Sequence, residues 1–342
     1  MISKTLLLKN LITGATGLVG MHIAIDLLKK GESVRASFTK NSRLNDVKNI
    51  FTFYKCESLF KDIEWVEMNL TDIIQVYESV KGMDHVFHSA AIVSFNKKDQ
   101  AKMNNINVKG TANIVNACLS ENIKKLGFIS SVAAIGRKNN SNGEYSEQNK
   151  WSSSKANSYY AISKYKAENE VWRGIQEGLN AVITNPGIIL GPSNWNRSST
   201  TIFKQINKGL TYYPGGTNGF VDVRDVSKSI IELVKSKVNA ERFIVVGQNI
   251  AYQKVFSSIA KALSVNEPQK LASKSLLELA WKLEALRCLI MRKNPSLTKE
   301  TARTSYQENR YSNHKIKSQL GFEFHTLEEA ILNTAKFILK FN

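Results

Sequence analysis

A tyrosine and a lysine four residues apart, Tyr160 and Lys164, are the residues of this chain best suited to acid–base chemistry. At that spacing both side chains lie on one face of a helix, which the sequence predicts from Tyr160 toward Glu170. A free tyrosine has a pKa of about 10, too high for a ready base at neutral pH. A neighbouring ammonium group favours the phenolate and lowers that pKa. The pair therefore predicts a tyrosine that gives or takes a proton at an alcohol or carbonyl oxygen.

Ser131 adds a third member to this pair. It ends a predicted strand, Leu126–Ser131, where its hydroxyl is placed to donate a hydrogen bond to the same substrate oxygen. The competing interpretation of Tyr160 and Lys164 is an ordinary surface pair, because such pairs are common. The strand-end serine and a glycine-rich turn earlier in the chain favour catalysis.

That turn, TGATGLVG over Thr13–Gly20, follows an apolar run that ends at Leu11 and Ile12 and predicts a buried strand. A predicted helix, Met21–Lys30, comes directly after it. Strand, glycine turn and helix in this order are the context of a dinucleotide-binding fingerprint. The alternative is a glycine turn that binds no ligand, and the rest of the chain weighs against it.

Each glycine of the turn has a separate physical role in this prediction. Gly14 permits a tight turn, Gly17 lets the backbone approach a pyrophosphate, and Gly20 lets the helix pack against the strand. The free N–H groups and the dipole at the helix N-terminus attract the phosphates. The residues predicted to bind the cofactor here are Gly14, Thr16, Gly17, Leu18, Val19 and Gly20.

The end of the second predicted strand, Glu32–Phe38, decides between two cofactors. An acid there would accept the ribose hydroxyls of NAD, but no carboxylate follows Phe38. Thr39, Lys40 and Arg43 follow instead, and hydroxyls and cations suit a 2′-phosphate. The sequence therefore favours NADP(H) over NAD(H), with a solvated basic loop as the alternative.

Predicted strands alternate with predicted helices along the first half of the chain. Further strands are expected at Ile63–Met68 and Met83–Ala91, and a helix at Asn104–Asn122. Gly110 inside that helix costs about 1 kcal/mol relative to Ala, which suggests a close approach or a purposeful distortion. This alternation predicts an α/β fold with a doubly wound parallel sheet.

The composition bounds the kinds of partner. The 342 residues carry a net charge of +18, enough to attract anionic cofactors and substrates. The basic residues are spread out without a nucleic-acid motif, so a small-molecule substrate is expected and nucleic acid is not. The three cysteines lie far apart, the histidines lack metal-ligand spacing, and no stretch predicts a membrane span. We expect a cytoplasmic protein without a metal.

The chain resembles the extended short-chain dehydrogenase/reductases, which include the NAD-dependent epimerase/dehydratase-like proteins. The matching stretches cover nearly the whole chain and follow the family's order: Thr13–Gly20, His88–Ala91, Asn107–Ile114, Ile129–Gly136, Tyr160–Glu168, Asn185–Pro192, Phe220–Val226 and Leu320–Ile331.

This resemblance implies roles for particular residues. It makes Ser131, Tyr160 and Lys164 the catalytic triad, with Asn107 helping a water to relay protons to Lys164. In the family Lys164 also holds the cofactor ribose, so Tyr160 and Lys164 count among the cofactor-binding residues. It also implies further cofactor contacts. Asn69 and Leu70 would contact the adenine, Ala90 and Ala91 would lie along the cofactor, and Pro186, Gly187 and Ile188 would contact its nicotinamide end.

Departures from the family pattern narrow the chemistry. Sugar dehydratases usually carry an acid after the residue that matches Ser131, but this chain has Val132 there. Nucleotide-sugar epimerases usually carry an arginine just before the stretch that begins at Phe220, and this chain has none at that place. What remains resembles the dihydroflavonol-4-reductase and 3β-hydroxysteroid dehydrogenase-like branch, which acts on ketones and alcohols of fairly apolar substrates. The alternatives are a nucleotide-sugar epimerase that retains its cofactor and a non-catalytic NAD(P)-binding regulator. The expected apolar lining is Trp195, Phe203, Tyr212 and Tyr213.

The resemblance also implies a division of the chain. A dinucleotide-binding domain is expected over residues 1–187, completed by 220–250, and a mostly helical substrate lobe over 188–219 and 251–342. A helix with a broad apolar face, Ser275–Met291, is expected to be buried in that lobe. By analogy with relatives, a homodimer would form through the helices that begin near Asn104 and Tyr160.

Overall fold

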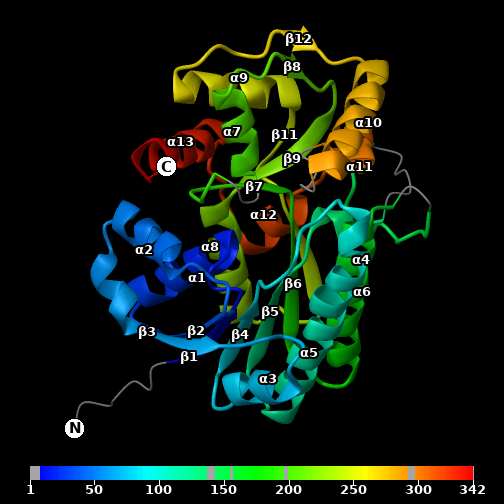
Figure 1. The fold of residues 1–342 in the computed structure, drawn as a ribbon. Coiled ribbons are helices and arrows are strands. Elements are labelled where there is room, and N and C mark those ends of the chain that lie inside the picture. Colours follow the sequence, from blue (N-terminus) through cyan, green and yellow to red (C-terminus); the bar gives the residue numbers. More distant parts are fainter. Residues whose placement is uncertain (1–7, 137–142, 155–156, 196–198, 292–296, 342) are drawn as a thin grey trace.

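The computed structural model describes residues 8–136, 143–154, 157–195, 199–291 and 297–341. A seven-stranded parallel sheet forms its lower half (Figure 1). The strand order is β3-β2-β1-β4-β5-β6-β10. The strands are β1 (Lys9–Thr13), β2 (Ser33–Phe38), β3 (Ile63–Glu67), β4 (His85–His88), β5 (Lys125–Ile129), β6 (Ala181–Pro186) and β10 (Glu241–Val245). The predicted doubly wound α/β fold is confirmed.

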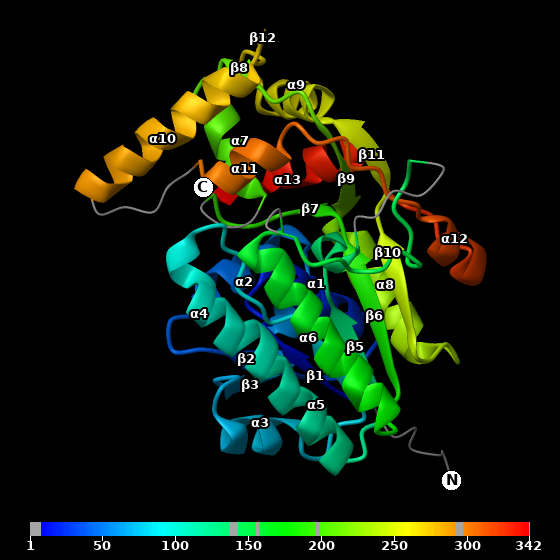
Figure 2. The same ribbon diagram turned by 90° about the vertical axis from the view of Figure 1, so that its right-hand side faces the viewer.

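Helices cover both faces of the sheet, as Figure 2 shows. One layer contains α1 (Leu18–Lys29), α2 (Leu44–Phe53) and α8 (Val223–Lys235), and the other contains α3 (Ile73–Val80), α5 (Gly110–Ser120) and α6 (Tyr159–Gln176). Successive strand residues alternate between the two cores, as the period of a strand requires. Leu11 and Phe128 belong to the core under α3, α5 and α6, whereas Ile12 and Ile129 belong to the core under α1 and α8.

The expected helix 104–122 is real but not uniform. Residues Asn104–Lys109 form a π-helical turn, and α5 continues from Gly110. A Cβ on Gly110 would stand 2.8 Å from Cβ of Leu70, so the glycine allows a close approach to the end of β3. Both features predicted from the costly glycine, a close approach and a distortion, are present. π-Helical turns often mark functional positions.

The C-terminal lobe contains more helix than strand, as expected, and it also contains short strands. A three-stranded sheet in the order β11-β9-β7 and a two-stranded pair of β8 and β12 join its helices. The strands are β7 (Ile188–Leu190), β8 (Tyr212–Tyr213), β9 (Thr217–Asp222), β11 (Gln248–Ala251) and β12 (Lys270–Leu271). The helices are α7 (Thr200–Asn207), α9 (Tyr252–Leu263), α10 (Lys274–Met291), α11 (Lys299–Thr304), α12 (His314–Leu320) and α13 (Leu327–Phe341). Except for β9, which is mostly buried, these strands are short and at most partly buried, so their apolar pattern is weak.

Two segments of this half belong to the large sheet instead. The stretch 220–250 supplies α8, which packs on β5 and β6, and the edge strand β10. Helix α12 packs against β10 rather than within the lobe. The chain therefore returns to the large sheet after it has begun the lobe.

The prediction that helix 275–291 is buried is wrong. Helix α10 runs along the outside of the lobe and extends away from it (Figure 2), and Leu279, Leu283 and Leu286 are each more than half exposed. Periodicity shows which residues share a helix face but not whether a partner covers that face.

The described residues contain neither a helix able to cross a membrane nor a cluster of side chains able to hold a metal ion. The three cysteines, Cys56, Cys118 and Cys288, are free and buried.

Candidate active site

The site residues gather where the order of the sheet reverses, between β1 and β4. In the sheet, β1 pairs on one side with β2, the next strand along the chain, and on the other side with β4. The carboxyl ends of strands at such a switch point form the ligand crevice of open α/β sheets. Thr13 at the end of β1 lies opposite His88 at the end of β4, and the segments that follow both strands meet there.

Gly14 begins the turn after β1 and packs directly against Ala90. Its φ of +66° lies in the left-handed region, and an added Cβ would stand 2.7 Å from Cα of Ala90. The amide of Ala90 donates to the Thr13 hydroxyl at 3.2 Å, which fixes the two segments to each other. The predicted cofactor residues Gly14 and Ala90 therefore lie side by side, and Ala91, the next residue, is exposed.

The rest of the turn leads into α1 with its first N–H groups uncapped by any side chain. Gly17 is the N-cap, and its amide donates to Gly14 O at 2.8 Å. A Cβ on Gly17 would meet only that oxygen, whereas a Cβ on Gly20 would stand 2.4 Å from it. Gly20 is thus needed for packing, and Gly17 leaves the outer side of the turn open. This open backbone cradle at a helix N-terminus fits a pyrophosphate.

The loop after β2 is attached to this turn. Ser42 accepts hydrogen bonds from the Thr16 hydroxyl at 3.2 Å and from the Thr39 amide at 3.0 Å. Lys40 and Arg43 are exposed on the same loop. The structure therefore brings the residues predicted to hold a 2′-phosphate next to the glycine turn.

Asn69 and Leu70 follow β3 and have structural partners. The side-chain oxygen Oδ1 of Asn69 accepts from the backbone amide and the hydroxyl of Thr71, at 3.1 and 2.9 Å. Leu70 is buried against Gly110, and its backbone oxygen accepts from the Asn113 amide at 2.8 Å. These contacts hold the turn after β3 against α5, and an adenine contact by either residue stays a prediction.

Ser131 and Tyr160 come together at the carboxyl ends of β5 and β6, where the serine hydroxyl lies near enough to affect the pKa of the tyrosine. Ser131 follows β5, and Tyr160 stands in the first turn of α6, which Ser158 caps by accepting from the Ala161 amide at 2.8 Å. Burial raises the pKa of Tyr160, while the Ser131 hydroxyl lowers it. The sequence predicted that the Lys164 ammonium lowers the pKa of Tyr160. In the structure the pKa of Tyr160 is raised instead, because burial has the larger effect.

Lys164 lies one turn further along α6 and is almost completely buried. Its Nζ donates to Ile129 O at 2.8 Å and stands 4.6 Å from the centre of the Phe128 ring. Burial lowers the pKa of Lys164 to about 8, and the carboxylate of Glu168 opposes that effect. At neutral pH the group is still a cation, held at the strand end beside Tyr160.

Asn107 lies in the π-helical turn, buried beside α6. Its side-chain oxygen accepts from the Ile92 amide at 2.7 Å, and its Nδ2 donates to Ile92 O at 2.9 Å and to the Ser163 hydroxyl at 3.0 Å. Asn107 therefore fastens the segment after β4 to the helix that carries Tyr160 and Lys164. A water relay through Asn107 stays a prediction.

The sequence did not reveal a buried carboxylate beneath the triad. Glu168 accepts hydrogen bonds from the Ser130 hydroxyl at 2.7 Å, from the Asn185 amide at 2.8 Å and from Arg242 at 3.0 Å. The Asn185 Nδ2 also donates to Ser131 O at 3.0 Å. The one signal in the sequence is its position four residues after Lys164, on the same helix face.

Phe95 is a second residue that the sequence did not single out. Its ring packs edge-on against the Tyr160 ring with 5.9 Å between centroids, and 40% of its surface is exposed. The available signal was an aromatic residue in the loop that follows β4. Phe95 gives the surroundings of the tyrosine hydroxyl an apolar wall.

Pro186 ends β6, and Gly187 and Ile188 continue into the lobe. A Cβ on Gly187 would stand 2.4 Å from Gly219 O, so this glycine lets β7 pass close to β9. Their predicted contact with the nicotinamide end is consistent with their place beside Asn185 but is not tested by any contact in the structure.

The expected aromatic lining is not assembled as a group. Phe203 is fully buried in the main core, so its predicted substrate contact is wrong. Trp195 and Tyr213 are half-buried against that core, and Tyr212 is exposed in β8. A hydrophobic aromatic side chain is more often buried in a core than placed in a site, and Phe203 follows that rule.

His88 is structural. It lies fully buried between the hydroxyls of Thr13 and Thr111, with its ring nitrogens 2.6 and 3.0 Å from them. Burial lowers its pKa to about 3, so it stays neutral. It connects β1, β4 and α5 under the glycine turn.

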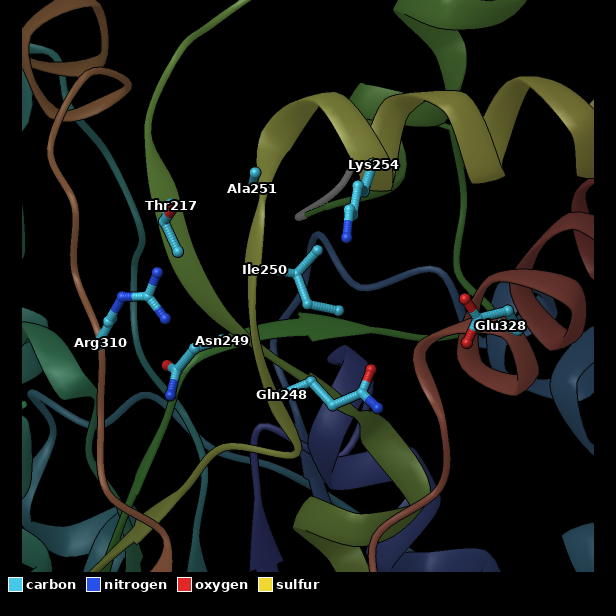
Figure 3. A pocket seen from close by; sticks show the side chains of 8 residues that line it. All are labelled: Thr217, Gln248, Asn249, Ile250, Ala251, Lys254, Arg310 and Glu328. Atoms are coloured by element: carbon cyan, nitrogen blue, oxygen red, sulfur yellow. The ribbon is translucent and has the colours of Figure 1, made fainter.

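A polar pocket of about 740 Å³ lies in the lobe, away from the triad. In Figure 3 Arg310 and Glu328 stand at opposite sides of it, and the Lys254 side chain points from α9 toward the space between them. None of the predicted catalytic or cofactor residues lines it. The site described here is therefore the crevice at the strand ends.

Comparison with known proteins agrees with this geometry. A family model described as "NAD dependent epimerase/dehydratase family" matches residues 10–247. The chain is 28% identical to a Synechocystis sp. protein named "Putative dihydroflavonol 4-reductase", over 94% of this chain and 91% of that protein. It is 27% identical to cinnamoyl-CoA reductase CAD2 of Medicago truncatula, over 76% and 83% of the two chains.

Solved structures match over nearly the full length. The crystal structure of gox2253 is 26% identical, with a TM-score of 0.79 over 97% of this chain and 98% of that one. A UDP-glucose 4-epimerase from Thermotoga maritima has a TM-score of 0.76 at 20% identity, over 97% and 99% of the two chains. The second likeness concerns the fold alone.

Proposed function

The chain belongs to the NAD dependent epimerase/dehydratase family as an NAD(P)-dependent reductase of the extended short-chain type, and we propose that it reduces a ketone or aldehyde group on a small, fairly apolar substrate. The observation that carries the proposal is the placement of Tyr160 beside Ser131 and one helical turn from the buried cation of Lys164. The cofactor, when bound, supplies the hydride.

The protein's own groups handle the oxygen of the substrate. Ser131 donates a hydrogen bond that polarises the carbonyl, and Tyr160 gives its proton to the oxygen as the alcohol forms. Burial keeps the pKa of Tyr160 raised, which suits a proton donor rather than a base. Lys164 holds the cofactor ribose and, as a cation, stabilises the phenolate left after the transfer.

Two features support reduction over other chemistry of the family. Val132 follows Ser131, so no carboxylate stands there to protonate a leaving hydroxyl, as dehydration requires. Arg224, the arginine nearest the place where epimerases bind a diphosphate, is engaged in a 2.6 Å ion pair with Asp222. Phe95 beside Tyr160 suits an apolar substrate. Several of the relatives are also named as reductases, which supports reduction.

We assign NADPH as the preferred cofactor from the loop after β2. Thr39 and Ser42 present hydroxyls there, and Lys40 and Arg43 present exposed cations beside the glycine turn. A 2′-phosphate is recognised by such groups, whereas a ribose diol is recognised by a carboxylate. The open backbone at Gly17 fits the pyrophosphate of either cofactor.

The test is nicotinamide absorbance over time with NADPH and then NADH, against a panel of aldehydes, ketones and nucleotide sugars. Tyr160→Phe removes the proton donor and should lower kcat about 10²–10⁴-fold while cofactor binding persists. Tyr159→Phe, the neighbouring tyrosine, is the matched control and should retain activity.

Other outcomes point to the alternatives. No net cofactor consumption, together with a co-purifying cofactor and a nucleotide sugar that changes stereochemistry, would replace the proposal with an epimerase. Cofactor binding without turnover, and a cellular effect that survives Tyr160→Phe, would replace it with a non-catalytic regulator.

A further inference from the structure

The outer side of α10 carries an apolar stripe that we call the leucine row: Leu276, Leu279, Leu283 and Leu286. These side chains are 36%, 56%, 57% and 55% exposed. Steps of three, four and three residues place all of them on one line along a helix. Four large apolar side chains in one exposed line are unusual on a surface without a partner.

The opposite side of α10 attaches the helix to the protein. Trp281 and Glu284 are half-buried and Cys288 is buried on that side, and α10 packs there against α11. Lys299 of α11 stands 5.9 Å from the centre of the Trp281 ring. The leucine row therefore faces away from the lobe that holds the helix.

The segment around the row has more basic than acidic residues. Lys282 and Arg287 border the row on its two sides, and each pairs with a glutamate further round the helix, Lys282 with Glu278 at 3.9 Å and Arg287 with Glu284 at 2.8 Å. Between residues 270 and 303 the sequence has eight Lys or Arg against three Glu, within a chain of net charge +18. We propose that the leucine row docks this protein onto the surface of an anionic lipid bilayer.

The physics of interfacial helices supports this occupant. Such a helix lies in the plane of the interface with its leucines among the acyl chains, and basic residues at the edges reach the headgroups. Each Lys or Arg near an anionic surface adds about 1 kcal/mol of attraction. Leucine burial and charge attraction then act in the same direction.

A second copy of the chain fits the row less well. The three-four-three spacing is that of a coiled-coil seam, in which the positions beside the seam set partner choice. Those positions hold Lys282 and Arg287, so a partner α10 would bring cations opposite cations in either orientation.

A further apolar feature lies on the same side of the molecule. The loop that leads into α4 (Gln100–Met103) carries Val93 and Phe95, which are 59% and 40% exposed. Helix α4 lies on the side of α10 in both views (Figures 1 and 2). Docking through α10 would bring this loop, including Phe95 beside Tyr160, near the lipid.

The experiment is co-sedimentation of the full chain with vesicles of phosphatidylcholine alone and of phosphatidylcholine mixed three to one with phosphatidylglycerol. We expect binding to the mixed vesicles that weakens with added salt. The L279Q/L283Q variant should lower the partition coefficient about tenfold or more, since it removes two buried side chains. The matched control is L332Q/L339Q, which changes two exposed leucines of α13 (47% and 64%) and should bind like the wild type.

Several results would overturn the proposal. Wild-type protein that stays in the supernatant with both vesicles excludes lipid docking, as does an equal loss in both double variants. Sedimentation velocity tests the remaining alternative, in which the leucine row binds a second copy of the chain. A wild-type dimer that L279Q/L283Q converts to a monomer would support that alternative and overturn lipid docking. Circular dichroism and melting temperature confirm that each variant is folded, and none of these measurements depends on the substrate.

Discussion

The carboxylate of Glu168 and the amide of Asn185 join the catalytic helix to the strand beside it. Asn185 donates to Glu168 at 2.8 Å and, through the same nitrogen, to the backbone oxygen of Ser131 at 3.0 Å. One buried acid on α6 thus fixes the serine that follows β5 through a residue on β6. The position of Ser131 relative to Tyr160 depends on this contact, although Glu168 itself does not touch the reacting oxygen.

Glu168→Gln should destabilise the protein strongly. The change leaves Arg242 and the Ser130 hydroxyl facing an amide, and breaking a buried ion pair from one side costs about 3 kcal/mol or more. Urea unfolding measures the loss. Glu177→Gln removes an exposed ion pair with Arg173 on the same helix and should cost at most about 0.5 kcal/mol. Equal losses of unfolding free energy in the two variants would show that the buried network of Glu168 stabilises the protein no more than the exposed ion pair does.

Lys164 should make stability depend on pH in the alkaline range. Burial lowers its pKa to about 8 from an ordinary value of 10.5. Between these values the unfolded chain binds a proton that the folded chain has released, so the free energy of unfolding rises with pH. Relative to Lys164→Met, the wild type should gain up to about 3 kcal/mol across this window. Chemical denaturation of both proteins at steps from pH 8 to 10 checks this, and parallel curves would contradict it.

Gly14→Ala should disrupt the cofactor turn by packing as well as by strain. An added Cβ would collide with Ala90, 2.7 Å away, at a φ of +66°. Gly31→Ala is a matched control, because Gly31 has a φ of +73° but open space around it. The control should lose about 1–2 kcal/mol from the left-handed backbone alone. Gly14→Ala should lose at least twice as much and bind NADPH weakly, as thermal melts and cofactor titration would show.

The cations after β2 should decide between the two nicotinamide cofactors. Replacing both Lys40 and Arg43 with Ala removes two charge-assisted contacts to the 2′-phosphate, which predicts a KM for NADPH about 10–100-fold higher. The KM for NADH should stay nearly constant, because NADH lacks that phosphate. Lys48→Ala, a nearby exposed lysine on α2, should change neither value. A shift of both constants together would mean that the loop acts on folding rather than on recognition.

The sequence predicted the parts of the site whose chemistry is local. The order of residues around Gly14, Gly17 and Gly20 placed the turn, and the spacing of Tyr160 and Lys164 placed both on one side of α6. In each case a backbone requirement or a helical repeat fixes the residue types over a short span. Such signals do not depend on the rest of the fold.

Contacts between distant segments were beyond the sequence. The hydrogen-bond partners of Glu168 come from or directly follow β5, β6 and β10, which are far apart in the sequence. Phe203 belongs to the lobe in sequence but packs in the main core. The apolar pattern of α10 predicted a helix, but its exposure depends on what surrounds it. The pKa of Tyr160 likewise follows from burial, which no pattern of neighbours along the chain reveals.

The edge position of β10 has a consequence for synthesis on the ribosome. Arg242, which pairs with Glu168, lies on the strand of the large sheet that comes last in the chain. The catalytic helix therefore leaves the ribosome before Arg242 does. During that interval Glu168 lacks its ion pair with Arg242, so the network that positions Ser131 is complete only after β10 has been added.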